Sequence, residues 1–209
     1  MSGRIENTYP LIAICRHRIG IDGDGVTTLV GGAGCPLSCR WCLNKNELKN
    51  AVPKWVTAEE LLSRVKQDDL YFRATGGGIT FGGGEPLLYP SFIRDFCLIR
   101  PEEWHINIET SLSVPKENVE QICKYIDMFI VDCKDMNDDI YRRYTGGQAR
   151  CMKENLSLLV REIGNDRIIV RVPIIPEMNN ENDRKNSINE LRSIGIKNID
   201  MFTMVTREK

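Results

Sequence analysis

The sequence predicts a parallel α/β fold, and three observations support this. Short β-branched runs alternate with amphipathic stretches along the chain, no low-complexity linker or internal repeat interrupts the alternation, and polar residues follow almost every expected strand. Strands that alternate with helices build a parallel sheet with right-handed crossovers. A chain of 209 residues with 42% hydrophobic content can fill one sizeable core, so we expect a single domain over residues 1–209.

The elements follow in order along the chain. Thr27–Val30 is the first expected strand, and Thr57 and Glu60 offer a capping box ahead of a helical run at 61–67. Further strands are expected near Ile79–Phe81, His105–Glu109, Met128–Asp132, Ile168–Val172 and Ile199–Thr203. Further helices are expected near Ser91–Leu98, Lys116–Tyr125, Met152–Ile163 and Asp183–Ile194.

Charge and composition narrow the classes of partner. The net charge is −1, with 28 basic and 29 acidic residues, so binding to nucleic acid or to an anionic membrane is not expected. Residues 1–10 lack a secretory pattern and no apolar run reaches membrane-spanning length, which predicts a cytoplasmic protein with reduced thiols. Five of the eight cysteines are expected to pack in the core: Cys15, Cys97, Cys123, Cys133 and Cys151.

The other three cysteines, Cys35, Cys39 and Cys42, lie within eight residues after the first strand. Soft thiolates suit iron–sulfur clusters or zinc, and closed structural sites usually take four protein ligands. Three thiols therefore predict a cluster with one iron left open for a ligand. Two alternatives stay open, namely zinc with a fourth ligand such as His17 or His105, and buried thiols without metal.

Residues that could contact a ligand lie at the ends of the other expected strands, which is where ligands of parallel α/β folds bind. Three glycines, Gly82 to Gly84, precede Glu85, and such a run allows either a tight turn or close approach of a ligand to the backbone. Asp132 and Lys134 lie two apart and share a face, as a surface ion pair or as the charged end of a buried strand.

The cysteine spacing, with Trp41 just before the third thiol, resembles the signature of the radical S-adenosylmethionine (SAM) superfamily. Further segments occur at separations similar to those of its glycyl radical enzyme activases: Ile21–Gly25, Asn44, Gly83–Glu85, Glu109–Thr110, Asp132–Lys134, Asp135–Asp138 with Tyr144–Gly146, and Arg171–Pro176. The resemblance covers nearly the whole chain. It implies a partial β/α barrel of about six repeats that ends after the sixth strand, one [4Fe–4S] cluster and SAM.

The resemblance also implies roles for single residues. Cys35, Cys39 and Cys42 would ligate three irons of the cluster. The SAM amino group would be held by Gly83, Gly84 and Glu85, and its carboxylate or nearby polar groups by Lys134 and Arg171.

A monovalent cation beside SAM is the last implied feature of the site. Its ligands would be the side chains of Glu109, Thr110 and Asp132 and the backbone carbonyl of Ile130. Glu109 stands where the family often has Asp.

The implied activity is reductive cleavage of SAM to a 5′-deoxyadenosyl radical, with the protein excluding water and oxygen. The radical would take hydrogen from a glycine of a partner glycyl radical enzyme, with flavodoxin or ferredoxin as the reductant. Related activases continue beyond the position of Lys209, so we expect an open cleft or a different substrate class. Two alternatives are a radical SAM enzyme acting on a peptide or small molecule, and a non-enzymatic iron–sulfur module.

Overall fold

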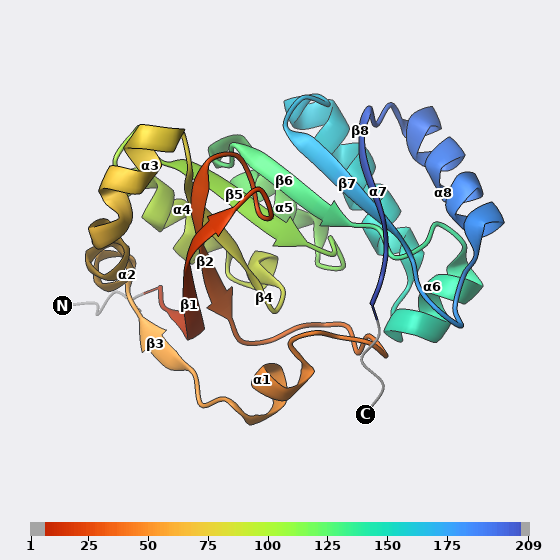
Figure 1. Cartoon of the computed structure of the whole chain (residues 1–209), viewed down its shortest axis with the longest axis horizontal. Helices are drawn as coiled ribbons and strands as arrows, with labels where there is room; N and C mark the ends of the chain where they lie inside the picture. Colours follow the sequence, from red (N-terminus) through yellow and green to blue (C-terminus); the bar gives the residue numbers. More distant parts are fainter. Residues whose placement is uncertain (1–6, 206–209) are drawn as a thin grey trace.

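The computed structural model describes residues 7–205, which form one eight-stranded sheet with helices against it (Figure 1). The strands are β1 (Tyr9–Ile19), β2 (Val26–Gly32), β3 (Lys54–Val56), β4 (Gly78–Gly83), β5 (His105–Thr110), β6 (Met128–Asp132), β7 (Ile168–Ile174) and β8 (Asn198–Thr203). Their order is β3-β1-β2-β4-β5-β6-β7-β8. With β3 and β8 at its two edges the sheet does not close, which is consistent with the predicted partial barrel.

All six predicted strands are confirmed, and they pair in parallel from β2 to β8. The sequence analysis missed β1 and β3, which add antiparallel strands beside β2. Along β1 the burial alternates after Leu11, and the pairing register shifts between Cys15 and Arg18, where His17 has a positive φ of 55°. This bulge interrupts the apolar run and hides the strand from a search for continuous β-branched residues.

In the described part of the chain, eight α-helices connect the strands: α1 (Lys45–Asn50), α2 (Ala58–Val65), α3 (Asp69–Thr75), α4 (Pro90–Ile99), α5 (Lys116–Ile122), α6 (Asp138–Thr145), α7 (Ala149–Ile163) and α8 (Glu181–Ile194). The capping box at Thr57 is present, since its hydroxyl accepts a hydrogen bond from Glu60 N and the Glu60 carboxylate accepts one from Thr57 N. The short helices α1 and α3 were not predicted.

The core lies between the sheet and the helices behind it in Figure 1. Its largest fully buried side chains include Trp104, which packs edge-on against Phe72 with ring centroids 5.0 Å apart. Cys123 and Cys133 are buried as predicted, whereas Cys97 and Cys151 are only half-buried. Cys15 is exposed, so its prediction as a core residue is wrong, because it lies on β1 where alternate side chains face solvent.

The loop between β1 and β2 lies across the face of the sheet opposite the helices, in front of β5 and β6 in Figure 1. The backbone oxygen of Asp22 in this loop accepts hydrogen bonds from Thr80 Oγ1 at 2.7 Å and Asn107 Nδ2 at 3.2 Å. The buried Asp22 carboxylate itself accepts from Arg18. Among the described residues, no helix is both long enough and apolar enough to span a bilayer.

Candidate active site at the carboxyl ends of the strands

The cysteine loop leaves the carboxyl end of β2 and runs along the edge of the sheet as far as α6, as the orange segment of Figure 1 shows. Two backbone hydrogen bonds attach it there, from Ser38 N to Thr145 O at 2.8 Å and from Arg40 N to Tyr144 O at 2.9 Å. Helix carboxyl ends carry unpaired carbonyl oxygens, and this loop satisfies two of them. The loop is thereby held over the carboxyl ends of the parallel strands.

The three thiols of this loop differ in environment. Cys35 is exposed, while Cys39 and Cys42 are half-buried. Burial raises the pKa of the Cys39 thiol to about 11 and also raises the pKa of Cys35. Metal binding therefore has to displace protons from these thiols.

Within residues 7–205, no three His, Cys, Asp or Glu side chains converge as they would on a single metal ion. Neither histidine of the zinc alternative joins the three cysteines. His17 lies 3.7 Å from Asp68 and packs on Tyr71, and His105 begins β5 at its amino end, whereas the cysteine loop lies at the carboxyl ends of the strands. A four-iron cluster binds each thiolate at a different iron, so its ligands need not converge on one point. Three soft donors on one loop fit such a cluster.

The glycine run ends β4 and packs directly against the start of the cysteine loop. Gly84 N donates to Gly32 O at 3.0 Å and Glu85 N donates to Gly34 O at 2.8 Å. A Cβ on Gly84 would lie 2.1 Å from the Gly34 oxygen, and Gly83 has a φ of 86°. Glycine is needed here for contact between two backbone segments, which joins the two loops into one unit.

The Glu85 side chain is buried and turns toward the loop after β5. One carboxylate oxygen accepts hydrogen bonds from Thr110 Oγ1 at 2.7 Å and Leu87 N at 3.2 Å. The other accepts from Ser111 N at 2.9 Å and Ser111 Oγ at 2.7 Å. The side chain thus ties the turn after β4 to the loop after β5, and burial raises its pKa despite these hydrogen bonds.

Asp132 and Lys134 form an ion pair of 2.9 Å at the carboxyl end of β6. The Lys134 side chain is only 15% exposed. Burial alone would lower the Lys134 pKa, but the Asp132 carboxylate outweighs this and raises it, and the Cys39 thiol acts in the same direction. Lys134 therefore keeps a positive charge beside the cysteine loop. Its ion pair with Asp132 lies at the charged end of a buried strand and is not a surface pair.

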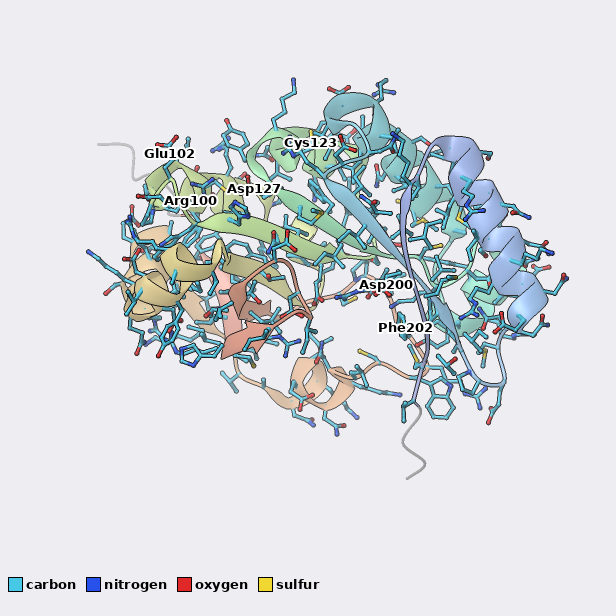
Figure 2. All side chains as sticks on the ribbon, turned by 45° about the horizontal axis from the view of Figure 1, so that its top comes forward. Arg100, Glu102, Cys123, Asp127, Asp200 and Phe202 are labelled. Atoms are coloured by element: carbon cyan, nitrogen blue, oxygen red, sulfur yellow. The ribbon has the colours of Figure 1, made fainter. Side chains whose placement is uncertain are left out.

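Arg171 occupies the middle of β7, next to Asp132 in the sheet register. Its Nη1 donates to Glu109 Oε1 at 2.6 Å and its Nη2 donates to the backbone oxygen of Ile21. The Nε atom is 3.9 Å from Asp200 of β8, labelled in Figure 2. The guanidinium therefore joins β5, β8 and the loop between β1 and β2.

The side chains predicted as cation ligands are bonded to other protein groups in this arrangement. Glu109 is paired with Arg171, and Asp132 is paired with Lys134. Thr110 Oγ1 donates to Glu85 and accepts from Leu112 N at 2.9 Å. Each predicted side-chain donor already has a protein partner.

A cavity of about 510 Å³ opens at the other end of the strands, beneath the loop between β1 and β2. It is lined by the amino-terminal residues of β5 to β7, with Arg171 and Ile130 at its inner wall. Asp127 at its rim lies 3.7 Å from Arg100, and Figure 2 labels both residues. This cavity and the cysteine loop are on opposite sides of Arg171 along the strands.

Comparison with known proteins places the chain in a family. The model of the radical SAM superfamily matches residues 29–208. The chain belongs to the radical SAM superfamily. It is accordingly a radical SAM enzyme, and the matched segment contains the carboxyl end of β2, the cysteine loop and the whole of the other five parallel strands, β4 to β8.

Two curated relatives of this radical SAM chain are activating enzymes. The pyruvate formate-lyase-activating enzyme of Clostridium pasteurianum is 37% identical over 180 residues, which cover 86% of this chain and 73% of that enzyme. The (2S)-3-sulfopropanediol dehydratase activating enzyme of Klebsiella oxytoca is 35% identical over 136 residues, which cover 63% of this chain and 42% of that enzyme. The fold is also that of SuiB from Streptococcus suis, with a TM-score of 0.65 and 15% identity over 85% of this chain and 38% of SuiB.

Three residues of this radical SAM site were missed or given no role in the sequence analysis. Asp22 carries the loop across the sheet, Ser111 holds Glu85, and Asp200 faces Arg171. Their partners lie 58, 26 and 29 positions away in the chain, so no local pattern marks them. The one available signal was the position of Ser111, two residues beyond the end of the strand predicted near His105–Glu109.

Proposed function

We propose that this enzyme activates a glycyl radical enzyme, using a [4Fe–4S] cluster held by Cys35, Cys39 and Cys42 together with SAM. The observation that carries the proposal is the three-thiol loop without a convergent fourth ligand among the described residues, in a chain 37% identical to an activating enzyme. When bound, the reduced cluster and SAM supply the one-electron chemistry by which a hydrogen atom leaves the target glycine. Flavodoxin or ferredoxin is the proposed electron donor.

The chain's own residues have defined tasks in this proposal. The cysteine loop is fixed against α6 and against the glycine run, which keeps the thiols over the strand ends. Lys134 is the cationic group that can meet the SAM carboxylate, because it is mostly buried, holds its charge and lies close enough to the cysteine loop to interact with Cys39. Glu85 contributes through its backbone and by holding the loop after β5, since its carboxylate is fully engaged.

The first experiment tests the cluster. Each of Cys35, Cys39 and Cys42 is changed to Ser, and Cys97→Ser on α4 serves as the matched control. After anaerobic reconstitution, iron and sulfide should bind to wild type and to the control but not to the three variants. Full iron content in any of the three would remove the ligand assignment.

The second experiment tests the substrate. A glycyl radical enzyme with deuterated glycine is incubated anaerobically with the reconstituted protein, SAM and a one-electron reductant. We expect a persistent organic radical doublet on the partner and deuterium in the 5′-deoxyadenosine released. If deuterium arrives only from a labelled peptide or small molecule, the activase proposal fails and the peptide or small-molecule alternative replaces it.

A further inference from the structure

Most of the charges around Arg171 are paired within the described residues, and the additional carboxylate, Asp200, is 57% exposed to solvent. Glu109 and Asp200 lie against the guanidinium, and Asp132 is beside it in the register of β6 and β7. Asp132 has its own cation in Lys134, and Asp22 has its own in Arg18. Glu109 therefore depends on Arg171 to compensate its negative charge, because Arg171 is its only ion-pair partner in the described chain.

Arg171 is also fixed in position. Its side chain is 18% exposed, and it donates to Glu109 and to a backbone carbonyl from different elements. A guanidinium held on two sides supplies a permanent positive charge without the entropy cost of capturing an ion from solution. A bound monovalent cation would bring the same single charge to the same carboxylate.

From this geometry we infer that the guanidinium of Arg171 takes the place of a bound monovalent cation at this site, and that the chain binds SAM without a monovalent metal ion. The inference rests on the proposed function only for its ligand, SAM. The ion pair between Glu109 and Arg171 is itself a property of the chain, so part of the test needs neither cluster nor SAM.

The test begins with the metal-free, cluster-free chain in choline chloride, NaCl and KCl at equal ionic strength. The melting temperature of wild type should be the same in all three salts. Arg171→Met should melt lower in choline and recover part of the loss in NaCl or KCl, because Glu109 then lacks a cation. Arg167→Met is the matched control, since Arg167 donates to backbone carbonyls and its loss should produce no salt-specific recovery.

Two further variants separate charge from structure. Arg171→Lys keeps the charge and should show no difference between the salts. Adding Glu109→Gln to Arg171→Met removes the carboxylate and should abolish the recovery. A merely structural arginine would give the same loss in every salt, which would overturn the inference.

The last arm uses the reconstituted protein and SAM. Wild type should bind SAM equally well in all three salts, and Arg171→Met should bind about tenfold more weakly in choline than in KCl. A wild-type SAM affinity that rises in KCl or NaCl would overturn the inference. Failure to bind SAM in any salt would count against the proposed function instead, while the melting series would still decide the role of Arg171.

Discussion

Glu85 is predicted to be a structural clamp, and its replacement should weaken folding by a predictable amount. Each carboxylate oxygen accepts one backbone N–H and one hydroxyl, from Leu87 and Thr110 on one side and twice from Ser111 on the other. In Glu85→Gln one oxygen becomes an amide N–H₂ that cannot accept these bonds. The hydroxyl can rotate to another partner, but the backbone N–H stays buried without one, at a cost of about 2 kcal/mol.

Glu85→Ala removes both oxygens and leaves two backbone N–H groups unpaired, so we expect a loss of about 4 kcal/mol. Urea unfolding of the metal-free chain, followed by circular dichroism, gives the free energy of unfolding for each variant. The control is Glu59→Gln on the exposed side of α2, which should change it by less than about 0.5 kcal/mol. If Glu85→Gln is as stable as this control, the hydrogen bonds to Glu85 do not support the fold as argued.

Three further predictions concern the same region. Burial raises the Glu85 pKa in the folded chain above its ordinary value of 4.5. The stabilisation that Glu85 contributes is therefore complete below that value and is lost as the pH rises through the raised pKa. The difference in unfolding free energy between wild type and Glu85→Gln should be larger at about pH 4 than at about pH 8, and a constant difference would contradict the shift. Gly84→Ala places its Cβ 2.1 Å from Gly34 O, so it should lower the free energy of unfolding by more than about 2 kcal/mol and reduce iron uptake. The control is Gly31→Ala, whose Cβ meets only ordinary contacts from 3.6 Å and which should take up iron normally on reconstitution. Asn155→Leu removes the amide donor, at 2.9 and 2.8 Å, from the carbonyls of Leu112 and Val114 in the loop after β5. These carbonyls keep only the weak Cys151 thiol donor, at 3.8 and 3.1 Å, so the melting temperature in calorimetry should fall through a loss of about 2 kcal/mol in the free energy of unfolding. An unchanged melting temperature would show that the thiol is a sufficient donor.

Sequence alone determined the features that depend on neighbouring residues. The six parallel strands follow from short β-branched runs, and the capping box of α2 joins residues only three apart. The cysteine triplet also lies within one loop, so its spacing was visible without a fold. Periodicity and capping act over a few residues, and the chain displays them directly.

Only the tertiary structure decided how the charged groups of the site are paired. Glu109 and Arg171 are 62 residues apart and meet because β5, β6 and β7 are adjacent in one register. Glu85 turns toward a loop 25 residues away, and its motif gives no sign of that direction. The missed strand β1 matters for the same reason, because its loop carries a backbone carbonyl to Arg171 across 150 residues. Pairings at such separations are selected by sheet order and register, which are properties of the whole chain and not of any segment.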